Sequence, residues 1–203
     1  MSNTSNNKNS APVKNPTRVV TGECILSYAN LWEPKSINGG DAKYSVSLII
    51  PKSDEETLAK IEKAIQIAYE DGKSKLKGNG KSVPPLNAIK NPLRDGDAER
   101  PDDEAYADSY FINANANSDY PPSLVDKKVE PITTHSEIYS GVYAKASINF
   151  YAFNANGNKG IAAGLNGIQK IRDGQPLGNV NNPKDDFGQL ESDDADSEDD
   201  FLS

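Results

Sequence analysis

The chain has 203 residues with 30 acidic and 22 basic side chains, so its formal net charge at pH 7 is −8. This length suits one domain with a buried core, and no apolar run approaches the roughly eighteen residues of a membrane span. The single cysteine, Cys24, excludes a disulfide framework or a thiolate metal cluster within one chain, and we expect it to be a small buried apolar side chain. We therefore predict a soluble protein with no membrane association and no secretory signal.

The first part of the chain predicts a hairpin after a polar lead-in. Residues 1–16 are rich in Asn and Ser and predict a disordered segment. Residues 17–28 alternate apolar and polar side chains, which indicates a strand with a bend or bulge at Gly22. After an expected loop over residues 29–41, a second strand at residues 43–50 would complete the hairpin.

The clearest helix of the chain follows this hairpin. Ser53, with Glu56 three residues later, forms a capping box that predicts the helix start, and Gly72 predicts its end. The helix carries one apolar stripe, which consists of Leu58, Ile61, Ile65 and Ala68. A single stripe indicates that the helix packs on a sheet.

Loops dominate the middle of the chain. Residues 82–136 predict long connections with short strands near residues 107–114 and 127–132, and irregular stretches of this kind often carry binding surfaces. Three carboxylates in this region could bind Mg²⁺, namely Asp95, Asp97 and Asp102. Solvated turn carboxylates are the more common explanation of such a cluster.

Residues 142–153 alternate strictly and predict a strand with two different faces. One face is apolar. The other is aromatic, basic and amide-bearing, and consists of Tyr143, Lys145, Ser147, Asn149, Tyr151 and Phe153. Rings on which bases stack, beside a Lys that meets phosphate, are typical of surfaces that bind single-stranded nucleic acid. Because Tyr and Phe also favour strands for packing reasons, the pattern by itself leaves both interpretations open.

The last predicted strand, residues 159–172, contains glycines that permit curvature, and Lys159, Lys170 and Arg172 add positive charge to it. Five or six short antiparallel strands with one helix after the second strand suit a small Greek-key barrel. We therefore predict a mainly β fold, a small antiparallel Greek-key barrel with one α-helix and long loops.

The end of the chain is strongly acidic. Residues 185–203 contain nine carboxylates and no Lys or Arg, and without them 21 acids face 22 bases. Like charges with little apolar surface predict a disordered, solvated tail. A tethered polyanion also competes with nucleic acid for basic groups on its own domain, and solubility alone does not require the apolar tip at Phe201.

Motifs of catalysis are absent from the sequence. The segment 78–82 ends like a phosphate-binding loop, but Lys75 occupies the position of the first glycine and a helix precedes it. The one histidine, His135, cannot supply the usual zinc ligands, and no serine-hydrolase or metalloprotease motif occurs. We predict a protein that is not an enzyme and that holds no metal and no cofactor.

Several segments resemble a known family. They are residues 91–97, 100–103, 110–114, 139–153 and 157–178. Together they are similar to the phage and prophage single-stranded DNA-binding proteins, formerly a domain of unknown function. The resemblance covers residues 17–178 and implies an OB-fold core, sequence-tolerant binding of single-stranded DNA, and an acidic tail whose terminal aromatic contacts replication proteins. It also implies a role in DNA replication and recombination of a bacteriophage, in the cytoplasm of the bacterial host.

From the residues and this resemblance we predict a single-stranded DNA-binding domain at residues 17–178 and an acidic tail at residues 179–203. Bases are expected to stack on Tyr143, Tyr151 and Phe153, with Trp32 and Tyr44 from the hairpin. Phosphate and polar contacts are expected from Lys35, Lys43, Lys145, Asn149, Lys159, Lys170 and Arg172. A phage or host polymerase or helicase would bind the tail at Asp199, Asp200 and Phe201, and a homodimer is compatible with the sequence.

Two other functions remain open at this point. A protein-interaction or virion scaffold domain with a solubilising tail would bind no oligonucleotide. A Mg²⁺-dependent nuclease that uses Asp95, Asp97 and Asp102 would show metal-dependent turnover, which Asp97→Asn would abolish.

Overall fold

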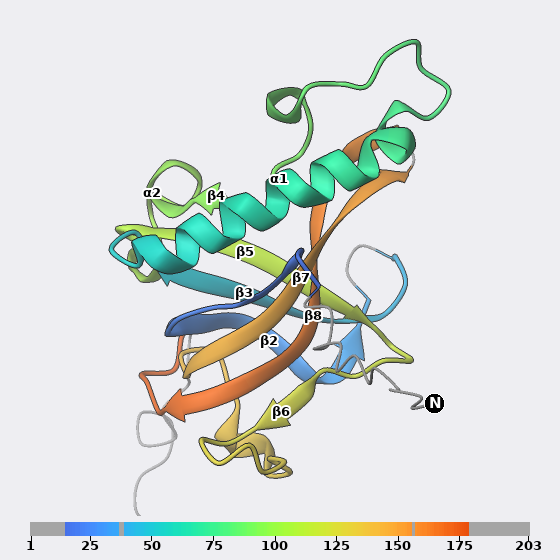
Figure 1. The fold of residues 1–203 in the computed structure, drawn as a ribbon. Coiled ribbons are helices and arrows are strands. Elements are labelled where there is room, and N and C mark those ends of the chain that lie inside the picture. Colours follow the sequence, from blue (N-terminus) through green and yellow to red (C-terminus); the bar gives the residue numbers. More distant parts are fainter. Residues whose placement is uncertain (1–14, 37–38, 156, 179–203) are drawn as a thin grey trace, which may run out of the picture.

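The computed structural model describes residues 15–36, 39–155 and 157–178, and within them the chain forms one eight-stranded sheet and one long helix (Figure 1). The strands are β1 (Arg18–Val20), β2 (Cys24–Lys35), β3 (Lys43–Pro51), β4 (Arg94–Asp95), β5 (Ser109–Asn117), β6 (Ser123–Val125), β7 (Tyr143–Ala155) and β8 (Asn158–Arg172). The helices are α1 (Glu55–Lys77) and the short α2 (Gly96–Glu99), with 3-10 turns at Leu86–Ala88, Glu104–Tyr106 and His135–Glu137. The predicted acidic tail, and the predicted lead-in except for residues 15 and 16, lie outside the described residues.

Five of these strands close into a ring. β2 pairs with β3, β3 with β5, β8 with β7 and β7 with β2, all antiparallel, and a parallel pairing of β5 with β8 completes the circle. The predicted small barrel is therefore confirmed. Its sheet, counted over the described residues, has eight strands instead of five or six, and β8 pairs in parallel with both β5 and β6. Parallel neighbours cannot be joined by a tight turn, so a prediction built on consecutive hairpins misses them.

Two short strands extend the sheet beyond the ring. β1 pairs with the free edge of β7, and β6 pairs with β8. The single strand predicted with a bend or bulge at Gly22 is instead two strands, β1 and β2, which Gly22 separates and which both pair with β7. In Figure 1, α1 lies above the sheet and β6 lies below it.

The hydrophobic core lies inside the ring and under α1. The inward side chains of β7 include Ala144, Ala146, Ile148 and Phe150, and each of them is at most 2% exposed. Their burial confirms the two-faced strand that the alternation predicts. Cys24 is 1% exposed, as expected of a small apolar side chain. Removal of such surface from water stabilises the fold by about 25 cal/mol per Å².

The ends of α1 differ from the predicted ones. Asp54, not Ser53, is the N-cap residue, because its carboxylate accepts a backbone N–H of the first turn at 3.1 Å. The C-cap is Gly78, and Gly72 lies inside the helix. A Cβ built on Gly72 would be 2.1 Å from the Cβ of Ala152 in β7. The glycine that predicts a helix end therefore marks a close contact between helix and strand.

Two strand boundaries also differ from the prediction. β2 continues to Lys35 through residues expected to form a loop, because it bulges before Asn30 and then pairs with β3 again. The strand expected near residues 127–132 lies earlier in the chain, as β6. Residues 126–130 form a turn in which the Asp126 carboxylate accepts two backbone N–H groups.

Candidate nucleic-acid interface

The barrel presents two different outer faces. We call the outward side chains of β2, β3 and β5 the hairpin face, and those of β1, β7 and β8 the β7 face. Since β3 pairs with neither β7 nor β8, the two faces lie across the five-stranded ring from each other. The residues that the sequence analysis assigns to one groove are therefore divided between two surfaces.

The hairpin face is polar, and neither β3 nor β5 contains an acidic residue. Strand register places Ser45 opposite Asn115 and Ser47 opposite Asn113. The amide of Asn30 in β2 donates a hydrogen bond of 3.1 Å to Ser45 Oγ, which joins a third strand to this row. Amides and hydroxyls on strands that carry no carboxylate suit the sugar–phosphate backbone of a nucleic acid.

Two predicted cations belong to this face. Lys35 and Lys43 pair across β2 and β3, and both are exposed. With Ser45 and Asn115 they line a cavity of about 250 Å³, which Asp41 also borders. Neither lysine forms an ion pair with another described residue. Both ammonium groups are therefore free to meet phosphate.

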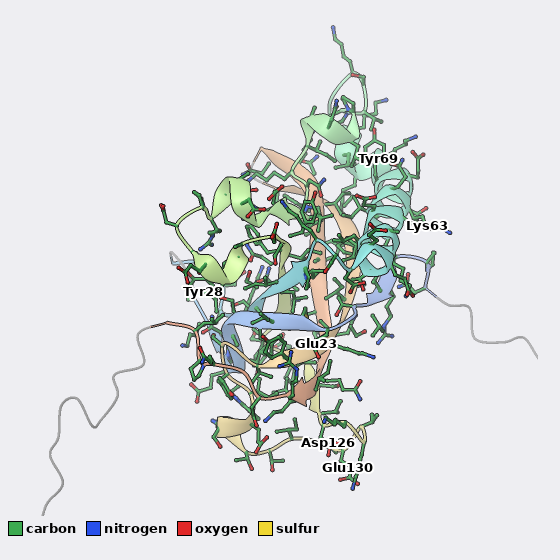
Figure 2. All side chains as sticks on the ribbon, turned by 90° about the vertical axis from the view of Figure 1, so that its left-hand side faces the viewer. Glu23, Tyr28, Lys63, Tyr69, Asp126 and Glu130 are labelled. Carbon is green, nitrogen blue, oxygen red and sulfur yellow. The ribbon has the colours of Figure 1, made fainter. Side chains whose placement is uncertain are left out.

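The hairpin face also carries an exposed tyrosine that the sequence analysis misses. Tyr28 lies in the bulge of β2 with a φ of +47°, and it is 58% exposed. Figure 2 shows it between β2 and the segment that carries α2. An aromatic residue in this left-handed region is uncommon. In the sequence, Tyr28 is only the last residue of an alternating pattern. The bulge turns its ring outward, and no nearby sequence motif predicts that bulge.

The cation that directly follows α2, Arg100, lies beside this tyrosine. Arg100 donates from Nη1 to the Tyr28 hydroxyl at 3.3 Å, and its guanidinium lies 5.5 Å from the ring centroid. The same guanidinium lies 5.2 Å from the ring of buried Tyr106, whose hydroxyl is 3.1 Å from Ser47 Oγ. These contacts connect the Tyr28–Arg100 pair to the polar row. An exposed ring with a neighbouring cation is what base stacking and phosphate contact require.

The β7 face holds the predicted platform. Its outward residues alternate with the buried core positions and include Tyr143, Lys145, Asn149, Tyr151 and Phe153. Tyr151 is 45% exposed, and Lys145 is exposed, whereas Asn149 and Phe153 are half-buried. A Cβ built on Gly164 of β8 would be 2.9 Å from Asn149 Oδ1, and one built on Gly160 would be 2.9 Å from Phe153 Cε1. The glycines of β8 therefore let these side chains lie close to the strand.

Three of the predicted groups on β7 and β8 make contacts within the protein. Arg172 pairs with Glu23 at 2.7 Å, and its guanidinium lies 3.4 Å from the ring centroid of Tyr143. This ring and this cation thus cover each other. Lys159 donates to the Lys77 carbonyl at 3.2 Å.

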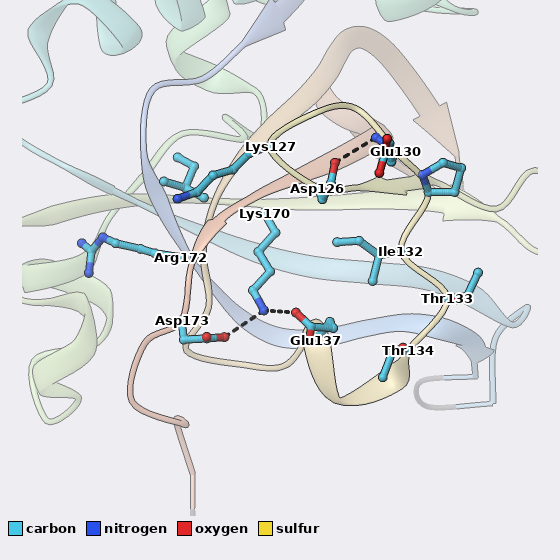
Figure 3. Close-up of a pocket in the computed structure, with 12 residues that line it drawn as sticks. Asp126, Lys127, Glu130, Ile132, Thr133, Thr134, Glu137, Lys170, Arg172 and Asp173 are labelled. Carbon is cyan, nitrogen blue, oxygen red and sulfur yellow. Dashed lines mark hydrogen bonds and ion pairs between the residues drawn. The ribbon is translucent and has the colours of Figure 1, made fainter.

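Lys170 is largely enclosed, with only 12% of its side chain exposed. Its ammonium bridges Glu137 and Asp173, the latter at 2.8 Å (Figure 3). Burial opposes its charge, but its hydrogen bonds to Asp173 and Glu137 raise the pKa of the ammonium, and Lys170 lowers the pKa of Asp173. The cavity around it, of about 560 Å³, is also lined by Asp126 and Glu130. Lys127 and Arg172 line this cavity too, but its four carboxylates outnumber the three cations, and two of them already pair with Lys170, which makes it a poor site for phosphate.

The two predicted aromatic residues of the hairpin are partly covered. The Trp32 ring stacks on His135 with 4.3 Å between centroids and 15° between planes, and its Nε1 donates to the Ile138 carbonyl at 3.1 Å. One face of this ring is thereby occupied. Tyr44 is half-buried and alternates with the outward Ser45. Neither ring is as accessible as that of Tyr28.

Of the three acidic residues considered for Mg²⁺, Asp95 and Asp97 pair with Lys52, whereas Asp102 is exposed and pairs with no other described residue. Lys52 contacts Asp95 at 2.9 Å and Asp97 at 2.6 Å, and Asp97 also accepts the backbone N–H of Asp108 at 3.0 Å. Hydrogen bonds from Lys52 lower the pKa of both carboxyls, and those to Asp97 and Asp95 raise the pKa of Lys52. Among the described residues, no three or more His, Cys, Asp or Glu side chains are grouped so as to hold a metal ion. Nor does any helix in the described ranges have the length and apolar character that a membrane crossing needs.

A five-stranded barrel of this connectivity, with a polar face across its second and third strands, has the OB-type architecture, which commonly binds oligonucleotides or oligosaccharides. The family model described as "Enterobacter phage Enc34, ssDNA-binding protein" matches residues 17–202. The chain belongs to this family of phage single-stranded DNA-binding proteins.

Individual relatives agree with this assignment. A protein of Acyrthosiphon pisum secondary endosymbiont phage 1, described as putative protein p50, is 33% identical over 157 residues, which are 73% of this chain and 80% of that protein. The solved structure of the single-stranded DNA-binding protein from bacteriophage Enc34 in complex with ssDNA has a TM-score of 0.68 at 22% identity, over 81% of this chain and 91% of that one. The gp2.5 single-stranded DNA-binding protein of bacteriophage T7 has a TM-score of 0.56 at 14% identity, over 80% and 96% of the two chains. These likenesses confirm the OB-like fold.

Proposed function

We propose that this protein binds single-stranded DNA with little sequence preference, and that it coats and protects the strand during phage replication and recombination in the bacterial cytoplasm. Its family and the name of its Enc34 relative support this role. The protein acts in this proposal by binding and not by catalysis.

The observation that carries the proposal is the hairpin face. OB-folds bind their ligands across the second and third strands of the barrel, and β3 and β5 are these strands in the ring. Here the face offers a row of amides and hydroxyls on two strands without acidic residues, with Lys35 and Lys43 among its cations and the Tyr28–Arg100 pair beside it.

Each group has a distinct part in the proposed contact. A base stacks on Tyr28 and contributes about 1 to 3 kcal/mol, while Arg100, Lys35 and Lys43 neutralise phosphates. The exposed Asn113 and Asn115 and the half-buried Ser45 bind the sugar–phosphate backbone, which carries no sequence information.

The β7 face remains a second candidate surface for the same function. Tyr151 and Lys145 are exposed there, and the sequence-based proposal of stacking on β7 depends on them. The enclosure of Lys170 and the pairing of Arg172 with Glu23 favour the hairpin face.

The acidic tail would regulate binding in this proposal. Its nine carboxylates compete with DNA for the basic groups of the barrel, and its tip at Asp199, Asp200 and Phe201 recruits a phage or host polymerase or helicase. Homodimer formation also remains a proposal from the sequence.

A fluorescence-anisotropy titration of labelled oligo-dT tests the proposal with the full chain. We expect tight, salt-sensitive binding that Tyr28→Ala weakens by about 5- to 150-fold, the equivalent of one lost stack. Tyr151→Ala, which removes an exposed tyrosine from the other face, should change the affinity little. The reverse result would place the DNA on the β7 face. Absence of binding by the unmodified chain would favour a scaffold domain.

A further inference from the structure

A groove with an apolar floor and a basic rim lies on both sides of β1, and we call it the β1 groove. On one side, β1, β7, β8 and β6 enclose about 400 Å³. On the other side, β1 and α1 enclose about 650 Å³. Arg18 and Val20 line both cavities, so the two meet at β1. The groove belongs to the β7 face, across the barrel from the hairpin face.

Exposed aliphatic side chains line the groove. Val20 is 56% exposed and Val129 is 68% exposed, and Val125 and Ile67 lie in the same two cavities. Val129 has a φ of +67°, which is a rare conformation for a β-branched residue. Hydrogen bonds of the 126–130 turn hold it there. Exposed apolar residues that gather in one groove are typical of an interaction site.

The rim of the groove is positive. Arg18 and Lys145 line the first cavity, Lys60 and Lys63 line the second, and no residue that lines either cavity is acidic. Lys60 pairs with Glu56 at 2.6 Å. Arg18, Lys63 and Lys145 form no ion pair with any other described residue. The cavity around Lys170, by contrast, is rich in carboxylates.

An occupant of this groove should combine negative charge with an apolar side chain. The last six residues of this chain, 198–203, have that composition: three carboxylates precede Phe201 and Leu202. We propose that this C-terminal tip docks in the β1 groove of its own chain. Asp199 and Asp200 would pair with Arg18 and Lys145, and Phe201 would pack on the exposed valines.

The connecting segment is long enough for this contact. Residues 179–197 lie between the last described residue and the tip, and about 3.3 Å per residue gives a reach of about 63 Å. That exceeds the length of β8, which is about 50 Å for 15 residues at about 3.3 Å each. Tethering also gives the tip an effective concentration of about a millimolar, so a weak contact suffices for occupancy.

This placement goes beyond the proposed binding of DNA. It holds the tip on the face across the barrel from the hairpin face, so the other tail carboxylates, and not those of the tip, compete with a strand bound there. A partner that captures the tip must instead displace it from the β1 groove. Lys145 then contacts the tail rather than phosphate.

Paramagnetic relaxation enhancement, the broadening of amide NMR signals by a nearby nitroxide, tests the proposal in the full chain. Because no DNA is present, the result does not depend on whether the protein binds DNA. A nitroxide is attached at Ser197→Cys, while buried Cys24 stays unlabelled. We expect broadening of the amide signals of Val20, Val129 and Lys145. Phe201→Ala should abolish this broadening, and Phe187→Ala, which removes a tail aromatic outside the tip, should leave it unchanged.

Other results would overturn the placement. Broadening of the amide signals of Asn113 and Asn115 would put the tip on the hairpin face. No selective broadening of any amide signal of the barrel would mean that the tip does not dock. A further sample mixes isotope-labelled chain without a nitroxide with spin-labelled chain without isotope enrichment. It distinguishes a tip docked on its own chain from a tip docked on a second copy. Broadening that persists in this mixture would show a second copy's tail in the groove, whereas broadening within one chain is lost there. The double variant Val20→Ser, Lys145→Ala should lose the broadening as Phe201→Ala does. Its own amide spectrum shows whether it remains folded.

Discussion

Three non-glycine residues in the described ranges have positive φ, and two of them, Tyr28 and Val129, are exposed apolar side chains. A backbone held in this region costs about 1 to 3 kcal/mol per residue and persists only where the surroundings impose it. Tyr28 lies on the hairpin face and Val129 lies in the β1 groove. Each of these two residues thus presents an apolar side chain at one of the two proposed binding surfaces.

A prediction at this scale concerns Cys24. Its Sγ donates to the Ala144 carbonyl at 3.2 Å, and burial raises the pKa of the thiol to about 12. Because the thiolate is the reactive form, we expect the native chain to resist a maleimide at pH 8 and to bind one equivalent after unfolding. Mass spectrometry measures the label. In the Ser197→Cys chain, one equivalent should bind before unfolding; rapid labelling of Cys24 itself would show that the contact between β2 and β7 opens.

At the scale of elements, the contact of α1 with β7 depends on Gly72. Glycine is about 1 kcal/mol less favourable than alanine inside a helix. It is accommodated here because a Cβ at this position would overlap with Ala152. Close approach of the helix therefore outweighs helix propensity.

We accordingly expect Gly72→Ala to lower the free energy of unfolding, since overpacking costs about 1 to 3 kcal/mol and exceeds the gain in propensity. Urea denaturation measures the change. Ser74→Ala is the matched control, because Ser74 is exposed on the same helix and should gain slightly from propensity alone. A Gly72→Ala protein more stable than the unmodified chain would show that helix and strand have room to separate.

At the scale of the whole molecule, charge is divided along the chain. The tail holds nine of the 30 carboxylates, and the remainder of the chain is close to neutral. Affinity for a polyanion then depends on how the tail's field opposes the cations of the barrel.

We expect a full chain whose nine tail carboxylates are changed to amides to bind oligo-dT more tightly at low salt. The two proteins should converge near 1 M salt, where the screening length is about 3 Å. Anisotropy titrations over a series of salt concentrations check this. The logarithm of the binding constant should fall with the logarithm of the salt concentration, with a slope of about −0.7 per phosphate contact. Equal affinity at low salt would contradict competition by the tail.

Local patterns in the sequence were sufficient for several features. The period of two in residues 142–153 predicts the buried and outward faces of β7, and the segments that resemble the phage family lead to the correct fold class. Side-chain alternation and helix periodicity act over a few residues, so one strand or helix at a time can be predicted from them. The charge of the tail is likewise a property of composition alone.

Only the tertiary structure decided how these elements meet. Closure of the ring through the parallel pairing of β5 with β8 puts Lys43 and Lys145 on different faces. The pairing of Arg172 with Glu23 joins residues far apart in the chain, and no local signal reveals that this cation is already neutralised. The bulge that exposes Tyr28 is set by the register between strands. Each of these outcomes depends on contacts between distant segments, which form only when the barrel closes.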